Sequence, residues 1–538
     1  MEKAILRGNV VVEPLVAGWH AWSHLVSPAC AALNFVHHIK LMQSFLEAPE
    51  LHAMANKDPK LKGGPFIDLP ESSLDEVKSI IARTLSQQAH QLQIAEDIRE
   101  IYNLLIREAD GFSLEQLYDK IPVSMRGYVE LSYNLLGMPN LKLHEALLYK
   151  SSVYNENLQS SIVYLLQEDE ERKFVFSTPR LNQKNCLEIK RPFKDKIYDK
   201  LAELRYNYRV KDEIISNLGF NSDEIKTFNT FLTTKTNQIT KMEPPIKSSK
   251  SGWRYFGHAC VLVTSDEGHT VLVDPLIPYD TNDVTKRFSF AELPEYIDVV
   301  ILTHNHTDHV LLETLLTLRH KIGKVIVPSN NGSLAAPSLK LMLEAIGFSA
   351  VLEMQELESY TRGDIELTAL PFFGEHGDLD ISSKAAWLVS AGKRNMLFAA
   401  DSNNIEPKLY DILAQHYGDI DTIFIGMECV GAPMSWVYGP LLAKNLERKN
   451  DQSRRLNGSD SESAIKLIDS LGCKNVYVYA MGMEPWLEFI APGTHSTKTD
   501  SIQILEAKKF VSLCKERSIN AELLFGRDDS MMARISNQ

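Results

Sequence analysis

The sequence predicts an α/β protein whose second half folds as an αββα sandwich behind an N-terminal half that is mixed and rich in helices. Three observations support this prediction. A polar, proline-bearing stretch at residues 241–252 separates two halves that differ in their pattern of apolar residues. From residue 253 onward, short apolar runs alternate with amphipathic stretches, which is typical of sheets with helices packed outside. One apolar run, at residues 298–303, ends directly at a cluster of histidines.

Residues 1–240 carry mixed signals and no catalytic motif. Residues 10–16 are predicted to be a strand, and residues 91–108 have apolar side chains at helical spacing. Two further helical patterns flank Gly219. The other expected features are a capped helix start at Ser113 with Gln116, strands or extended segments at residues 174–178 and around Arg191, and packing roles for His37 and His38. We therefore expect an accessory domain that serves docking or dimerisation.

The composition of residues 241–252 predicts a linker, and residues 253–538 are predicted to form the catalytic domain. The domain is expected to open with a hairpin made by residues 253–264 and 270–274. Further strands are predicted at residues 298–303, 324–327, 365–370, 385–390, 395–400, 422–425 and 475–480, and helices at 311–321, 338–346 and 461–471.

The composition narrows the function classes. A formal net charge of −13 disfavours nucleic acid or an anionic membrane as the main partner. The six cysteines are scattered without a CxxC pair, which argues against a disulfide framework and a thiolate zinc site. No signal peptide and no long uncharged apolar run is evident. We expect a reduced, cytoplasmic protein.

The run Thr-His-Asn-His-Thr-Asp-His at residues 303–309 carries the chemistry. His304 and His306 alternate, so on an extended backbone both imidazoles lie on one face and can share a metal. Asp308 and His309 enter the next turn and can address a second position nearby. Imidazole and carboxylate ligands suit zinc, iron or manganese. The motif predicts a site for two metals.

Two downstream segments offer further ligands. Asp401 ends the apolar strand at residues 395–400, where a carboxylate can bridge two metals. The turn at residues 373–377 presents Glu375 and His376 side by side, and one of these two is expected to be a ligand.

These motifs resemble the metallo-β-lactamase superfamily: HxHxDH after a strand, a ligand about 70 residues on, and an aspartate about 25 residues beyond it. The entry hairpin is also similar, with Asp274 in the position of the superfamily's structural aspartate. In the hydrolytic members, histidines supply the ligand after the hairpin and a last ligand after a late strand. Here Glu375 precedes His376, and residues 481–485 contain no histidine. The nearest is His495, which either reaches the site or is a loop residue.

A carboxylate-rich, open site favours iron and O2 chemistry over zinc. This pattern resembles a narrower group, the metallo-β-lactamase-fold diiron β-hydroxylases of nonribosomal peptide biosynthesis, such as the one in the chloramphenicol pathway. The resemblance implies that His304, His306, Glu375 and Asp401 hold one iron. It implies that Asp308, His309 and the shared Asp401 hold the other, with an oxo or hydroxo bridge between the irons.

The resemblance also implies an activity: a monooxygenase that hydroxylates the β-carbon of an amino acid carried as a thioester on the phosphopantetheine arm of a thiolation domain. Such an enzyme uses O2, an external reductant and an electron-donor protein, and belongs to antibiotic biosynthesis. A homodimer is expected from the resemblance alone. Among the catalytic residues we count Glu375, Asp401 and Glu428, the last as a supporting or switching carboxylate. Trp436, Tyr438 and Trp486 either line a channel or pack in the core.

Two alternatives remain open from the sequence. The first is a dinuclear zinc hydrolase of the same fold that acts on a thioester, lactone or phosphoester through a bridging hydroxide. The second is a docking or scaffold module whose metal site has decayed. The intact set of six ligand-type residues argues against the scaffold module.

Overall fold

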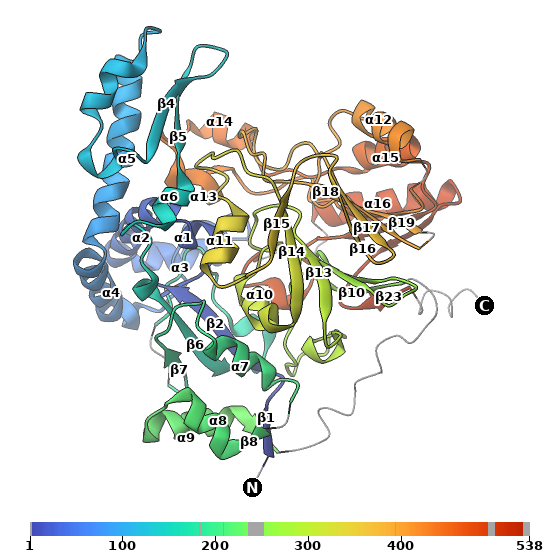
Figure 1. Ribbon diagram of the computed structural model, residues 1–538, viewed down its shortest axis with the longest axis horizontal. Helices are drawn as coiled ribbons and strands as arrows, with labels where there is room; N and C mark the ends of the chain where they lie inside the picture. Colours follow the sequence, from blue (N-terminus) through green and yellow to red (C-terminus); the bar gives the residue numbers. More distant parts are fainter. Residues whose placement is uncertain are drawn as a thin grey trace.

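The computed structural model of the chain describes residues 3–181, 184–207, 209–234, 252–392, 394–418, 420–492 and 501–530 (Figure 1). The expected linker lies outside these residues except for Gly252, and His495 lies outside them as well. The domain boundary at residues 241–252 therefore stays a prediction. No helix within the described ranges is long and apolar enough to cross a membrane.

The first sheet of the C-terminal half has seven strands and ends at β23, which comes from the far end of the chain. Its order is β15 (Val351–Met354), β14 (Ile322–Pro328), β13 (Ile297–Ile301), β12 (Thr270–Val273), β11 (Cys260–Thr264), β10 (Gly252–Gly257) and β23 (Asp528–Asp529). The run expected as one strand at residues 253–264 is two antiparallel strands. The reason is a tight turn at His258, whose φ of 51° is left-handed.

The second sheet also has seven strands. Its order is β16 (Ser359–Arg362), β17 (Ile365–Leu370), β18 (Ala386–Ala391), β19 (Arg394–Phe398), β20 (Thr422–Gly426), β21 (Asn475–Tyr479) and β22 (Asn520–Leu523). Large side chains fill the space between the sheets, among them Trp387, Phe398 and Phe424. Burial of such apolar surface is the main driving force for packing one sheet on the other.

Helices cover the outer face of each sheet. Apolar side chains of α10 (Leu312–Leu318) and α11 (Leu339–Ala345) pack on the first sheet. Those of α12 (Lys408–Tyr417), α15 (Ser461–Leu471) and α16 (Ile502–Glu516) pack on the second (Figure 1). The predicted αββα sandwich is therefore confirmed.

The sheet topology brings several strand ends to one edge. Strands β12 and β13 run parallel, as do β19, β20 and β21. The carboxyl ends of parallel strands in one sheet meet at the same edge. Asp274, His304, Asp401 and Glu428 all follow such ends.

The N-terminal half combines small sheets with helices, as predicted. Its strands are β1 (Lys3–Leu6), β2 (Val10–Val16), β3 (Trp19–His20), β4 (Val129–Tyr133), β5 (Pro139–Leu143), β6 (Gln159–Leu165), β7 (Leu187–Ile189), β8 (Arg209–Val210) and β9 (Leu232–Thr233). Its α-helices are α1 (Ser23–Val26), α2 (Pro28–Glu47), α3 (Pro49–Ala55), α4 (Leu74–Gln87), α5 (Ala89–Glu108), α6 (Glu145–Tyr149), α7 (Ile197–Glu203), α8 (Lys211–Leu218) and α9 (Ser222–Phe231). The predicted strand at residues 10–16 and the helices at 91–108 and around Gly219 are confirmed.

Some local expectations in this half need correction or refinement, and the packing role of His38 is confirmed. Ser113 does cap a helix, but residues 114–120 form a 3-10 helix and the Ser113 hydroxyl accepts from the N–H of Glu115. Residues 174–178 contain a turn instead of a strand, and β7 ends before Arg191. His38 is a packing residue, since its ring stacks on Trp19 with the centroids 3.7 Å apart.

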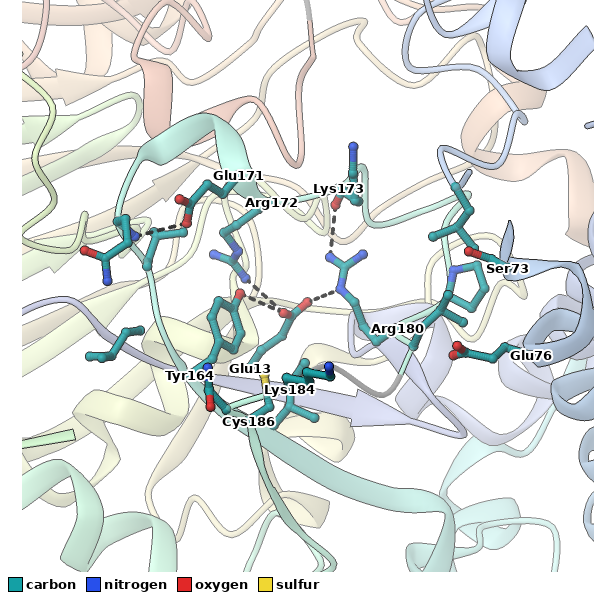
Figure 2. A pocket seen from close by; sticks show the side chains of 18 of the residues that line it. Glu13, Ser73, Glu76, Tyr164, Glu171, Arg172, Lys173, Arg180, Lys184 and Cys186 are labelled. Atoms are coloured by element: carbon teal, nitrogen blue, oxygen red, sulfur yellow. Dashed lines mark hydrogen bonds and ion pairs between the residues drawn. The ribbon is translucent and has the colours of Figure 1, made fainter. Parts of the chain in front are cut away.

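Buried ion pairs tie the two halves together. Arg172 of the N-terminal half donates to both carboxylate oxygens of Glu313 on α10, at 3.0 and 2.6 Å. Figure 2 shows Glu13 between Arg172 and Arg180, with which it forms ion pairs at 3.7 and 2.7 Å in the lining of a pocket of about 560 Å³. Tyr279 also donates to Glu313, at 2.9 Å. Because these charges are buried and paired, the halves form one packed unit.

We expect Glu313→Ala to lower the free energy of unfolding by about 3–5 kcal/mol, because it leaves the buried Arg172 guanidinium without its main partner. Chemical denaturation measures the effect. Asp411→Ala is the matched control: it breaks the exposed pair with Lys408 and should cost no more than about 1 kcal/mol. Equal small effects for the two variants would contradict the coupling of the halves.

Candidate metal centre

The histidine motif forms a tight turn after β13, at the edge where the strand ends converge. His304 and His309 are fully buried, whereas the side chains of His306 and Asp308 are 11% and 22% exposed. The turn begins at an isolated bridge between His304 and Lys384, which lies just before β18 of the second sheet. The motif therefore lies between the two sheets with its ligand-type atoms facing inward.

One group of ligand-type atoms consists of His304, His306 and Glu375, which lie within 4.8 Å of one another. His306 Nδ1 is 2.5 Å from Glu375 Oε1, and His304 Nε2 is 3.8 Å from Glu375 Oε2. The sequence left open whether Glu375 or His376 joins the motif. The structure brings Glu375 into this group, and His376 Nδ1 lies behind it, 2.6 Å from Glu375 Oε2.

Asp401 lies between this group and His309. Its Oδ2 is 3.0 Å from His309 Nε2 and 3.9 Å from His304 Nε2. The approach depends on Gly426, because a Cβ at that position would lie 2.4 Å from Asp401 Oδ1. Asp401 follows the end of β19, as predicted, and its role as a bridging ligand stays a prediction.

A second group consists of His258, Asp308 and His309. Asp308 Oδ2 is 2.9 Å from His258 Nε2 and 3.8 Å from His309 Nε2. Sequence reasoning missed His258, which lies 50 residues upstream in the turn between β10 and β11. Its place in the entry hairpin next to the motif strand was the available signal.

Asp274 orients His309, in agreement with its expected structural role. Its Oδ2 is 2.8 Å from His309 Nδ1 and accepts from the hydroxyl of Thr303 at 2.6 Å. The N–H of Thr303 donates to Asp274 Oδ1 at 2.8 Å. A carboxylate on Nδ1 turns Nε2 toward Asp401 and raises its basicity, as in other metal sites.

Several buried atoms face the centre without a hydrogen-bond partner among the described residues. They are His304 Nε2, His376 Nε2, Asp401 Oδ1 and Glu375 Oε2, the last of which has ion-pair contacts alone, to His376 Nδ1 at 2.6 Å and His304 Nε2 at 3.8 Å. Leaving such atoms unsatisfied costs free energy, so native proteins rarely do so unless a ligand completes them. Imidazole nitrogens and carboxylate oxygens at these distances fit two metal ions that share Asp401.

The charges of the centre also suit cations. Burial alone would raise the pKa of Glu375, but His306, His376 and His304 hold it well below its ordinary value. Burial and the neighbouring His309 lower the pKa of His304 well below its ordinary value. The pKa of Asp308 is lowered because His309 and His258 outweigh the effect of burial. Metal binding needs ionised carboxylates such as these and a neutral imidazole such as that of His304. Against the effect of burial, neighbouring carboxylates raise the pKa of His306 and His309, so a bound metal must displace protons there.

The loop that carries Glu375 has a strained backbone and is held in place by hydrogen bonds. Glu375 has a φ of 72°, a left-handed conformation that is rare for a residue with a side chain. Lys384 Nζ donates to the carbonyl of Gly374 at 3.1 Å, and Arg454 Nε donates to that of Gly377 at 2.8 Å. These contacts fix the carboxylate in the site, which is a reason for tolerating the strain.

Glu428 and Tyr438 border the centre, while the two tryptophans pack elsewhere. Burial together with Asp401 and Asp308 holds the pKa of Glu428 well above its ordinary value. Tyr438, on α13 (Ser435–Tyr438), has its hydroxyl 2.9 Å from His306 Nε2. Trp486 lies under Arg287 at 4.6 Å in an apolar cluster, and Trp436 lies against Gly64.

The fold and this centre define a dinuclear metalloprotein of the metallo-β-lactamase class. Two family models match the chain: the diiron non-haem β-hydroxylase N-terminal domain over residues 5–236, and the β-lactamase superfamily domain over residues 269–469. A curated relative from Streptomyces venezuelae, 4-amino-L-phenylalanyl-[CmlP-peptidyl-carrier-protein] 3-hydroxylase, is 38% identical over 90% of this chain and 91% of its own.

Solved structures agree with this match. The crystal structure of CmlA, a diiron β-hydroxylase from Streptomyces venezuelae, superposes with a TM-score of 0.88 at 34% identity, over 98% of this chain and 99% of that one. A glutamate-to-aspartate variant of CmlA gives a TM-score of 0.87 at 35% identity over the same shares. The chain belongs to the family of diiron non-haem β-hydroxylases, and it is an oxygen-dependent hydroxylase. The zinc hydrolase and the decayed scaffold are not favoured.

Proposed function

We propose that the protein hydroxylates the β-carbon of an amino acid held as a thioester on the phosphopantetheine arm of a nonribosomal peptide synthetase thiolation domain in the cytoplasm. The relative that matches most of this chain is named for such a reaction on a peptidyl carrier protein. The observation that carries the proposal is Glu375, whose carboxylate takes the place of a histidine beside His304 and His306.

In this proposal, His304, His306, Glu375 and Asp401 hold one iron, and Asp308, His309 and the shared Asp401 hold the other. The distances above support this division, with Asp401 Oδ2 within 4 Å of both His304 Nε2 and His309 Nε2. When bound, the iron pair supplies the electrons that activate O2 for oxidation of the β C–H bond, and an electron-donor protein restores them. The surrounding chain orients the ligands and excludes water.

We assign Glu428 the task of holding a proton beside the centre, because this partly buried carboxyl lies near three carboxylates, those of Asp401, Asp308 and Glu375, that raise its pKa. Glu428→Gln keeps the shape of the side chain but removes the titratable carboxyl proton. We expect an unchanged iron content and a turnover rate lower by about 10²–10⁴-fold, the usual range for loss of a general acid or base. Metal analysis measures the iron content, and single-turnover kinetics measure the rate. Undiminished turnover would remove Glu428 from the mechanism.

We propose a homodimer formed through the arm made by α5 and the β4–β5 hairpin, which projects at the upper left of Figure 1. The arm carries large exposed apolar side chains: Leu135 (107%), Leu136 (87%), Met138 (60%) and Phe112 (78%). An apolar patch of this kind marks an interaction site, and a two-fold axis would pair it with itself.

Light scattering should therefore give twice the chain mass of 60.8 kDa for the native protein. The double variant Leu135→Ser and Leu136→Ser should give a monomer with normal iron content. The control is Val284→Ser, which removes another exposed apolar side chain outside the arm. A native monomer, or a dimer that survives the double change, would refute this interface.

The reaction itself is tested by aerobic turnover of carrier-bound aminoacyl thioesters with reductant, followed by the intact mass of the carrier. Hydroxylation adds the mass of one oxygen atom. The new hydroxyl group should be found at the β-carbon of the amino acid only. Release of free amino acid without oxygen gain would instead indicate a thioesterase. No mass change across a broad panel of aromatic and aliphatic amino acids would overturn the proposal.

A further inference from the structure

His258, in the turn between β10 and β11, is held by the turn that follows β21. It is 2% exposed and has a left-handed φ of 51°. Its N–H donates to Glu484 Oε1 at 3.2 Å, and its carbonyl accepts from the N–H of Ala480 at 2.9 Å. The N–H of Gly482 donates to the ring nitrogen Nδ1 at 3.3 Å. The backbone and the ring are therefore fixed together.

These contacts determine where the ring carries its proton. Because Nδ1 accepts from the N–H of Gly482, the proton of the neutral imidazole resides on Nε2. Nε2 lies 2.9 Å from Asp308 Oδ2. His258 therefore donates a hydrogen bond to Asp308, and its Nε2 lone pair is not available to a metal.

Glu484 completes the support for His258. Its carboxylate is 1% exposed and also accepts from the hydroxyl of Tyr255 at 2.6 Å and the N–H of Gly526 at 3.3 Å. All three hydrogen bonds reach the same oxygen, Oε1. Glu484 thus acts as an anchor for the His258 turn.

We propose that His258 is a positioning residue for the second metal and acts by holding Asp308. The inference rests on the dinuclear iron site of the proposed function. The second metal has fewer proposed ligands than the first. Its ligand Asp308 has a side chain that is 22% exposed, more than either of the other two carboxylate ligands. Without the hydrogen bond, the Asp308 carboxylate is free to turn toward solvent. The 480–484 turn therefore acts on the metal centre through His258.

Two substitutions of His258, by asparagine and by glutamine, test this role, because their side-chain amides differ in reach by one methylene group. Asn tolerates the left-handed backbone at residue 258 but its amide does not reach Asp308, whereas the Gln amide can replace the Nε2–H donor. Metal-free protein is titrated anaerobically with Fe(II), and the two binding constants are fitted separately. We expect His258→Asn to weaken the second iron by about 10–100-fold with the first unchanged, and His258→Gln to restore it.

His52→Asn is the matched control, since His52 is equally buried and its Nδ1 also accepts from a backbone N–H, that of Ile67 at 2.8 Å. It should lower the melting temperature of the metal-free protein without changing either iron constant. If His258→Asn does not fold, as judged by that melting transition, His258→Gln alone decides, because the proposal requires it to bind the second iron normally.

Two results would overturn the proposal. Normal binding of the second iron by a folded His258→Asn variant would show that the hydrogen bond is dispensable. Loss of the second iron in His258→Gln would show that a ring nitrogen ligates the metal directly. A native protein that binds fewer than two irons would instead contradict the proposed function, so the two failures are distinguishable.

Discussion

Asp401→Ala is expected to leave the protein folded but unable to retain either iron. Asp401 Oδ2 lies between His309 Nε2 and His304 Nε2, so its removal takes a ligand from both metals at once. Changes behind the ligands already cost about 10–100-fold in metal affinity, and loss of a shared ligand should exceed that range. Hydroxylation should become undetectable. Iron analysis after anaerobic loading and desalting measures the loss.

Asp421→Ala serves as the control for this change. Asp421 precedes β20 at the opposite edge of the sheet, where it accepts from the N–H of Asn395 at 2.8 Å. The control should lose stability and keep two irons. Retention of one tightly bound iron by Asp401→Ala would mean that Asp401 serves a single metal and does not bridge.

Glu375→Ala and His376→Ala are expected to differ strongly although the residues are adjacent. Glu375 contacts His306 Nδ1 at 2.5 Å, within the ligand group, whereas His376 lies outside that group with its Nδ1 2.6 Å from Glu375 Oε2. Glu375→Ala should lose one iron and O2 reactivity, with turnover lower by more than about 100-fold. His376→Ala should keep both irons and reactivity.

Iron content and the rate of O2 consumption with loaded carrier measure this difference. The two variants are controls for each other, because they truncate neighbouring buried side chains in the same loop. The reverse outcome, with iron lost in His376→Ala and kept in Glu375→Ala, would return the site to the histidine-rich pattern of the hydrolases and undermine the choice of iron.

The grouping of the histidine motif and the position of Asp401 were predictable because local rules govern them. Residues two apart on an extended backbone share a face, so His304 and His306 pair without knowledge of the fold. Asp401 follows an apolar run long enough to be a buried strand, and strand ends gather at one edge in α/β sheets. The same periodicity located β13, β17 and α15 within one or two residues.

The choice between Glu375 and His376 was not predictable from local pattern. Both lie in a loop with left-handed backbone at Gly374, Glu375 and Gly377, where side-chain direction follows no period. The direction of the Glu375 side chain depends on hydrogen bonds that Lys384 and Arg454, from distant segments, donate to the loop backbone. The same holds for His258 and Tyr438, which reach the centre from 50 and 132 residues away. Only the sheet topology shows that these segments meet.

The central claim is that a carboxylate-rich centre at residues 303–309, 375 and 401 binds iron for O2 chemistry. Metal analysis of the purified protein, combined with its near-ultraviolet absorption, tests this most directly. We expect two irons per chain and a near-ultraviolet absorption band from an oxo-bridged iron pair. Two zinc ions per chain in a colourless protein that stays inert toward O2 after iron loading would contradict it.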